Sequence, residues 1–195
     1  MAGRRPSGTD TRAEIITAAR QAFTEEGYNQ ATLRGIARRA GVDPALVHHY
    51  FTDKPQLFVE AMQLPADPQQ VQQEAATPHD LPAGERLVER FLAQWEAGDG
   101  PGSASFVSVA QAVAASPQAA SAIREFVADR IRLTVPADED PALSRRRRAL
   151  VSAQLFGIAW HRYVMQVEPL ASATRAEVAR WAGPAIDPYL SRPPG

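Results

Sequence analysis

A short turn between two helical segments is the sequence feature that most constrains this fold. Gly41-Val42-Asp43 separates a helix expected to begin after Thr32 from one expected to begin at Pro44. Gly41 suits the positive φ that a sharp turn demands, and Pro44 suits the first helical position, where its missing N–H leaves no hydrogen bond unmade. The sequence therefore predicts two short helices that pack at a steep angle.

The apolar residues of this segment fall on one side of each helix. Ile36, Ala37 and Ala40 line the predicted inner side of the first helix, and Val47 and Phe51 line that of the second. The outward positions carry hydrogen-bond donors and small apolar groups: Thr32, Arg34, Arg38, Pro44, Ala45, His48, His49 and Tyr50. Such a surface suits duplex DNA, because guanidinium groups pair with guanine, small apolar groups contact thymine methyls and hydroxyls reach phosphates.

The remainder of the chain favours an all-α fold, because Ala, Leu, Arg, Glu and Gln are common and β-formers are sparse. One helix is expected from about Asp10 to Gly27, with Gly27 as a left-handed cap, and another from Lys54 to about Leu64. The Pro- and Gln-rich residues 65–82 predict a connector. Further helices are expected near residues 83–97, 103–115, 117–134, 144–167 and 174–190, about nine in all.

Composition argues against several classes of protein. The chain has no Cys, which removes disulfides, zinc fingers and iron–sulfur clusters. It also lacks a G-x-S-x-G motif, a phosphate-binding glycine loop and a metal-spaced His/carboxylate cluster, so we expect no enzyme, no cofactor and no metal. Glu85, Glu89 and Glu96 are interpreted as the solvated face of a helix.

Charge and hydropathy indicate where in the cell the protein works and which partners it can have. The net charge is −1, but residues 1–55 hold eight basic and six acidic side chains, which permits a local basic face. No apolar run is long enough to cross a bilayer, and the first ten residues lack the apolar stretch of a secretory signal. We therefore expect a cytoplasmic protein without a membrane partner.

Two motifs admit a second interpretation. His48 and His49 could form half of a metal site, but adjacent helical residues point about 100° apart, which favours DNA contact. The basic run Arg145–Arg148 could be a second nucleic-acid site, but its position beside Asp138–Asp140 favours local pairing or solvation.

The order of these motifs closely resembles the TetR (TetR/AcrR) family of bacterial transcriptional regulators. The resemblance rests on T-R-A-E-I-I-T-A-A-R-Q-A-F from Thr11, the Gly27-Tyr28 helix end, the Thr32 cap and Tyr50-Phe51-x-x-Lys54. It covers residues 10–62 strongly and continues more weakly through R-Y-V-M-Q-V-E-P-L-A-S near the C-terminus. This sequence departs from the family at His48, where Tyr is common.

The resemblance implies roles for individual residues. Thr32, Tyr50 and Lys54 would contact phosphates, and Arg34 would reach a base or phosphate. Arg38 belongs to the same exposed face. Pro44, Ala45, His48 and His49 would face the major groove. The implied function is a repressor that binds a palindromic operator in double-stranded DNA and is released by a small-molecule effector. The alternative is a helical protein-interaction module without specific DNA binding.

The C-terminal part is expected to bind the effector and a second copy of the chain. The predicted domains are a disordered tail (1–9), a three-helix helix-turn-helix domain (10–55) and a helical effector-binding and dimerisation domain (56–195). Residues 145–167 are apolar on two faces, so they are predicted to form a homodimer seam with residues 174–190. Candidate effector contacts are Trp95, Phe106, Gln111, Phe126, Trp160 and His161, with Arg130 as a further polar anchor.

Overall fold

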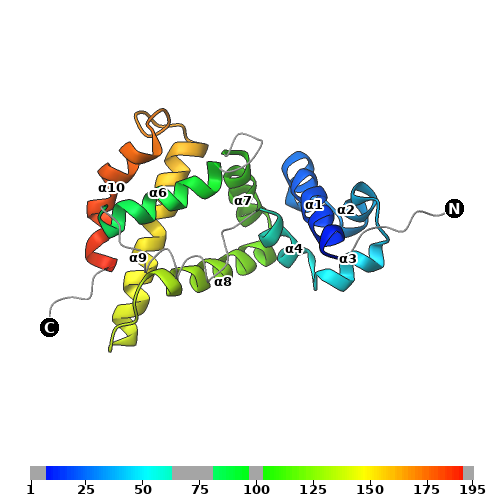
Figure 1. Ribbon diagram of the computed structural model, residues 1–195, viewed down its shortest axis with the longest axis horizontal. Helices are drawn as coiled ribbons and strands as arrows, with labels where there is room; N and C mark the ends of the chain where they lie inside the picture. The colour runs from blue at the N-terminus through cyan, green and yellow to red at the C-terminus, as the bar shows by residue number, and fades with distance from the viewer. Residues whose placement is uncertain (1–7, 63–80, 97–102, 191–195) are drawn as a thin grey trace. The chain divides into compact units, whose positions relative to one another are not determined.

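The computed structural model describes residues 8–62, 81–96 and 103–190. Within these ranges the chain forms nine α-helices and one π-helical turn and contains no strand, which confirms the all-α prediction (Figure 1). None of the helices in these ranges combines the length and the hydropathy that crossing a bilayer requires. The chain divides into two compact units, one made of Met1–Leu64 with Ser108–Ile123 and the other of Pro65–Val107 with Arg124–Gly195.

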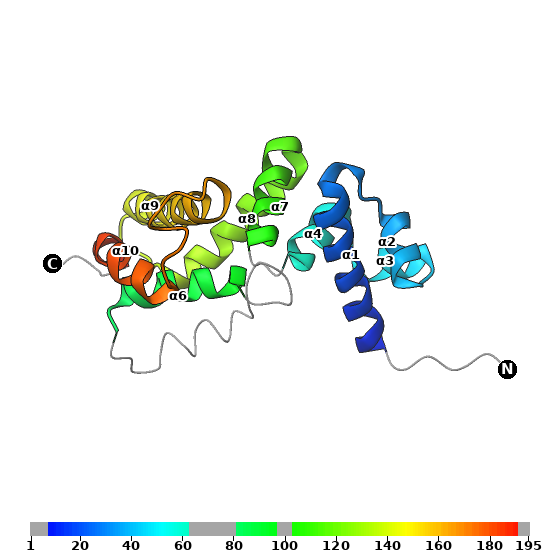
Figure 2. The ribbon, with the colours of Figure 1, turned by 90° about the horizontal axis from the view of Figure 1, so that it is seen from above.

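The first unit contains four helices from the N-terminal part of the chain: α1 (Gly8–Gln30), α2 (Leu33–Ala40), α3 (Pro44–Tyr50) and α4 (Lys54–Ala61). Helix α1 packs against α2 and α4, and α2 packs against α3 (Figures 1 and 2). The short helices thus depend on α1 for a continuous apolar surface, because helices of seven or eight residues are marginal alone.

Aromatic rings fill the centre of this unit. Phe23 from α1 meets Phe58 from α4 edge to face, with 4.9 Å between ring centroids, and Tyr28 meets Phe58 at 5.0 Å. Phe23, Phe51 and Phe58 are all buried, together with the predicted inner residues Ile36, Ala37 and Val47. Ala40 is half-buried. The predicted inner faces of the two short helices are therefore confirmed, with Ala40 at their edge.

Gly27 departs from its predicted role as a left-handed helix cap. Its φ is positive at 78°, but its ψ is 163°, so it lies outside the left-handed helical region. Helical hydrogen bonding resumes after it and α1 is assigned through Gln30. The predicted glycine break is therefore correct in position, but the predicted left-handed conformation is wrong. The Ala31 N–H donates to the Gly27 carbonyl at 3.2 Å.

The helices that follow Pro82 are α6 (Ala83–Glu96), α7 (Ser103–Ala115), α8 (Pro117–Thr134), α9 (Pro141–Ala159), the π-helical turn η1 (Trp160–Val164) and α10 (Arg175–Leu190). Ser116 caps α8, since its hydroxyl accepts from the Ala119 N–H at 3.2 Å, as the Ser116-Pro117 pair predicts. The expected connector at 65–82 lies almost entirely outside the described residues.

Helices α6 and α10 cross very closely in the second unit. A Cβ added to Gly84 would overlap the carbonyl of Gly183, and one added to Gly183 would overlap the backbone of Glu85. Asp187 adds a polar tie, because its carboxylate accepts from the Gly84 N–H at 2.7 Å. Residues 174–190 were predicted to pair with 145–167, and α10 does contact α9, but within the chain it packs mainly on α6 (Figure 2).

Helix α9 begins earlier and ends earlier than the predicted 144–167. Asp140 accepts from the Ala142 N–H at 2.7 Å and Pro141 occupies the first turn, so the helix begins three residues before the expected start. At the other end the α-helix gives way to η1 at Trp160. Helix α10 continues through Pro184 and Pro188 to Leu190, where the sequence predicts its end.

Candidate functional site

Side-chain caps fix the start of both short helices in the first unit. The Thr32 hydroxyl accepts from the Gly35 N–H at 3.0 Å, and the Asp43 carboxylate accepts from the Ala45 N–H at 2.8 Å. Between them Gly41 adopts the left-handed conformation (φ 66°, ψ 32°), as the sequence predicts. Because these bonds join residues two or three apart, the turn geometry is set locally.

The face opposite the core is exposed. Its residues come from the Thr32 cap, α2 and the start and outer side of α3: Thr32, Arg34, Arg38, Pro44, Ala45, His48 and His49. The Thr32 oxygen accepts the cap hydrogen bond, while its hydroxyl hydrogen can still be donated outward. All seven of these residues are thus exposed, as the helical periodicity predicts.

Tyr50 and Lys54, which are also predicted to contact DNA, are only half-exposed. The Tyr50 ring packs edge to face against His49, with centroids 5.1 Å apart. The Lys54 ammonium lies 4.5 Å from the Tyr28 ring centroid and donates to the Asn29 carbonyl at 3.3 Å. Burial lowers the pKa of Lys54 from its ordinary value. Tyr50 and Lys54 therefore border the exposed face rather than standing out from it.

Ion pairs attach this face to the rest of the unit. Arg39, at the end of α2, pairs with Glu25 at 2.6 Å and Glu26 at 2.9 Å on α1. Arg12 pairs with Glu60 on α4, and its guanidinium lies 5.3 Å from the Phe51 ring centroid. Among the arginines of α1 and α2, Arg12 and Arg39 pair with acids and Arg20 donates to the Ala61 carbonyl, whereas Arg34 and Arg38 are exposed.

Sequence reasoning missed Leu46, whose side chain is 36% exposed on α3 although it is large and apolar. Its position between Ala45 and the inner Val47 indicates that it flanks the face. The signal was available, since Leu46 follows Ala45 by one residue and cannot share the inner side with Val47.

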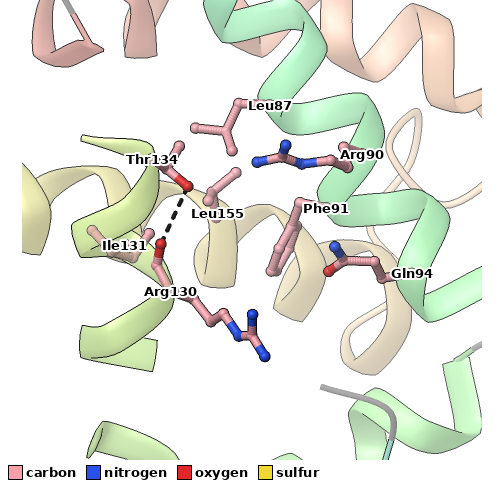
Figure 3. A pocket seen from close by; sticks show the side chains of 8 residues that line it. All are labelled: Leu87, Arg90, Phe91, Gln94, Arg130, Ile131, Thr134 and Leu155. Atoms are coloured by element: carbon pink, nitrogen blue, oxygen red, sulfur yellow. Dashed lines mark hydrogen bonds between the residues drawn. The ribbon is translucent and has the colours of Figure 1, made fainter. Parts of the chain in front are cut away.

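A second candidate site is a cavity of about 60 Å³ in the second unit, lined by Leu87, Arg90, Phe91, Gln94, Arg130, Ile131, Thr134 and Leu155. We call it the α6–α8 cavity. Figure 3 shows Leu87, Arg90, Phe91 and Gln94 extending from α6, with Arg130, Ile131 and Thr134 on α8 across from them. Within α8, the Thr134 hydroxyl donates to the Arg130 carbonyl at 3.3 Å (Figure 3).

None of the six predicted effector contacts lines this cavity. Trp95 and Phe106 are buried and meet edge to face at 5.0 Å, in an aromatic cluster with Phe91, Phe156 and Tyr163. Phe126 lies 5.0 Å below the Arg130 guanidinium. The remaining three are exposed: Gln111, Trp160 and His161. Arg130 is the one predicted polar anchor that lines the cavity, and the roles of Arg90 and Gln94 were missed.

Glu96 differs from the predicted solvated face of its helix. Its carboxylate accepts from Arg162 Nη2 at 3.1 Å and from the Tyr163 hydroxyl at 2.8 Å, and Arg175 lies 3.7 Å away. Burial, with the Glu96 hydrogen bond, raises the pKa of Tyr163 far above its usual value. Arg162 also donates to the Leu170 and Ala173 carbonyls, so this cluster connects α6 to η1 and to the loop before α10.

The basic run on α9 divides between buried and exposed side chains. Arg147 is buried, pairs with Asp138 at 3.3 Å and donates to the Tyr189 carbonyl at 2.9 Å. Arg148 donates to the Val135 carbonyl at 3.4 Å, whereas Arg145 and Arg146 are exposed. Arg147 and Arg148 therefore bind nearby groups of the second unit, in agreement with the prediction of local pairing.

Large apolar side chains remain exposed along one stripe of α9 and η1. Val151, Leu155 and Ala159 are buried, while Leu150 and Trp160 are 39% and 43% exposed and Ala153 lies between them. Helix α10 carries a similar stripe with Trp181, which is 50% exposed, and Pro184. The predicted two apolar faces of residues 145–167 are thus present, one inside the unit and one uncovered.

Comparison with known sequences assigns the chain to a family. Residues 15–61 match the family profile "Bacterial regulatory proteins, tetR family", and residues 82–190 match "Tetracyclin repressor-like, C-terminal domain". The transcriptional regulator BetI from Brucella canis is 36% identical over 89 residues, which are 43% of this chain and 45% of BetI. The matched segment thus spans just under half the length of that curated relative.

Solved structures give the same result over nearly the whole chain. A TetR-family regulator from Streptomyces coelicolor A3 is 34% identical, with a TM-score of 0.72 and coverage of 98% of this chain and 100% of that one. NalD, a secondary repressor of the MexAB-OprM multidrug efflux pump in Pseudomonas aeruginosa, shares the fold at 22% identity, with a TM-score of 0.65 and coverage of 96% and 100%. The chain therefore belongs to the TetR family of bacterial transcription regulators.

Proposed function

We propose that this chain is a transcriptional repressor that binds a palindromic operator as a homodimer and is released by a small-molecule effector. The observation that carries the proposal is the exposed, acid-poor face of α2 and α3, held in place by the Thr32 and Asp43 caps. The family consists of transcription regulators and not of enzymes. A protein that acts on chromosomal DNA would work in the cytoplasm, and we propose that location.

Each exposed residue of the face has a proposed role. Pro44, Ala45, His48 and His49 would lie in the major groove, with Arg34 and Arg38 beside them on α2. Thr32, Tyr50 and Lys54 would contact phosphates. Lys54 lies at the start of α4, where the unpaired amides of the helix add to its charge. Its contact with the Tyr28 ring supports the proposal, because it holds the ammonium at the edge of the face.

The exposed stripes of α9 and α10 are the proposed dimer seam. A two-fold dimer would present two recognition helices about 34–36 Å apart, or at a multiple of that distance, to match successive major grooves. The exposure of Leu150, Trp160 and Trp181 supports this arrangement, because large apolar side chains left in contact with water are candidates for burial against a partner. An effector would release DNA by binding more tightly to a dimer with a different spacing of the recognition helices.

The competing proposal is a helical interaction module without specific DNA binding. Titration of fluorescent DNA fragments, selected from a random pool with the pure protein, separates the two. We expect Arg34→Ala to weaken binding about tenfold or more if Arg34 reaches a base. Tyr50→Phe, which keeps the ring beside His49 and removes the hydroxyl, should reduce affinity several-fold by the loss of one phosphate contact.

A variant of an arginine outside the face and a titration of salt provide the controls for this experiment. Arg124→Ala, which removes an exposed arginine from α8, should leave the affinity unchanged. The slope of log affinity against log salt should fall by about one for each phosphate contact removed. If Arg34→Ala and Tyr50→Phe bind every selected fragment as the unmodified protein does, the face is not the DNA-binding surface.

A further inference from the structure

We propose that the α6–α8 cavity binds a compact organic anion, with a carboxylate or phosphate group and a short apolar part. The inference rests on the proposed function, because it identifies the chemical class of the effector. The lining residues divide into a polar set of Arg90, Gln94, Arg130 and Thr134 and an apolar set of Leu87, Phe91, Ile131 and Leu155. A ligand that satisfies both sets is amphipathic and negatively charged.

The lining of the cavity is positively charged, which favours an anionic ligand. Arg90 and Arg130 are two of the eight lining residues, and none of the eight is acidic. Both arginines are half-buried and approach from facing helices, with the Phe91 side chain between them in the view of Figure 3. Guanidinium groups pair with carboxylates and phosphates through two parallel hydrogen bonds, and partial burial strengthens that attraction over the same pair in water.

The side-chain oxygen of Gln94 provides a second, independent observation that favours a polar ligand. The Gln94 carbonyl oxygen is buried, and within the described residues no donor reaches it. A buried carbonyl without a donor is unfavourable, so a ligand hydroxyl or amide N–H would remove a cost that the unliganded protein bears. Figure 3 shows the Gln94 amide directed from α6 toward the side of the cavity where the Arg130 guanidinium lies.

The apolar wall and the volume limit the size of the ligand. Leu87, Phe91, Ile131 and Leu155 offer only hydrocarbon surface, and Phe91 also packs against Trp95 and Phe156. The cavity has a volume of about 60 Å³ and is partly open to solvent, so a small ligand can extend beyond its enclosed part. Drug-sized ligands occupy several times more space, so a short-chain or single-ring acid fits this cavity and a long acyl chain does not.

Calorimetric titration of the full chain at constant ionic strength tests the charge. The probes are hexanoate, benzoate and phenyl phosphate, each compared with a neutral or cationic analogue of the same shape: hexanamide, benzamide and benzylamine. At least one anion is expected to bind ten times more tightly than its analogue, and the better headgroup distinguishes carboxylate from phosphate. Equal binding of the amides or the amine, or no binding of any anion, overturns the proposal.

Variants locate the site. Arg90→Gln and Arg130→Gln should each weaken binding of the anion tenfold or more, while Arg124→Gln on the exposed side of α8 should bind as the unmodified chain does. Circular dichroism checks that each variant is folded. The comparison of anions with their neutral analogues uses the unmodified chain, so it tests the proposal even if a variant fails to fold. Folded Arg90→Gln and Arg130→Gln proteins that keep full affinity would place the anion elsewhere and overturn the proposal.

Titration of DNA without any anion distinguishes this inference from the proposed function. A chain that binds benzoate but no DNA would contradict the repressor proposal and support the anion site. A chain that binds DNA but none of the anions would contradict the anion site alone.

Discussion

Thr32 shows how one side chain can serve both the fold and the proposed contact with DNA. Its oxygen accepts the Gly35 N–H and so begins α2, while its hydroxyl hydrogen can be donated to a phosphate. A helix cap of this kind contributes about 1 kcal/mol to the free energy of unfolding. The two roles use different atoms of one hydroxyl group, so a single substitution can test both.

Thr32→Val is expected to lower the free energy of unfolding by about 1 kcal/mol and to weaken DNA binding several-fold. Thr32→Ser keeps the hydroxyl and should preserve both properties. Urea unfolding and fluorescence anisotropy with DNA measure them separately. Loss of stability without loss of DNA affinity in Thr32→Val would show that the hydroxyl is a cap and nothing more.

Helix α10 is held against α6 by backbone proximity that side chains would prevent. Gly84 and Gly183 face each other, and a Cβ on either would meet backbone atoms, which cannot move aside as the end of a flexible side chain can. The Asp187 carboxylate, which accepts from the Gly84 N–H, fixes the register of the crossing. Because α6 also carries Arg90 and Gln94, this crossing helps to position one wall of the α6–α8 cavity.

Gly84→Ala and Gly183→Ala are each expected to lower the free energy of unfolding by about 1–3 kcal/mol, because the helices must move apart. The double variant should lose less than the sum of the two, since one displacement relieves both overlaps. Chemical denaturation of the three variants measures this coupling. Strict additivity would indicate that the two glycines do not share one contact.

At the scale of the whole molecule, the stripe on α9 is the feature that the single chain leaves uncovered. Leu150→Glu with Trp160→Glu is expected to convert the proposed dimer into a monomer, because two charges would be buried without partners in the seam. DNA affinity should fall with it, since two linked recognition helices bind more tightly than one. Sedimentation velocity at micromolar concentration measures the change.

Val113→Glu is the matched control for that experiment. Val113 is 43% exposed, as Trp160 is, but belongs to α7 and not to α9, η1 or α10. The control protein should sediment as the unmodified chain does. A Leu150→Glu, Trp160→Glu protein that also sediments unchanged would contradict the seam.

Much of the first unit was predictable because its signals act over short distances. The Thr32 and Asp43 caps, the Gly41 turn and the Pro44 start each join residues that are neighbours in the sequence. The identity of the inner and outer sides of α2 and α3 follows from helical periodicity alone. The same local signals failed at Gly27, where a glycine break was evident but its conformation depended on how the chain turns toward α2.

The sequence by itself determined the helices and the face of α2 and α3, whereas only the tertiary structure decided what the C-terminal helices enclose. Glu96 resembles a solvated residue in sequence, yet it pairs with Arg162, 66 positions later. Trp95 and Phe106 resemble pocket residues and instead fill a core, while Arg90 and Arg130 line the cavity from different helices. Caps and turns are hydrogen bonds within a few residues, but a cavity depends on how distant helices pack, and periodicity does not specify which faces meet.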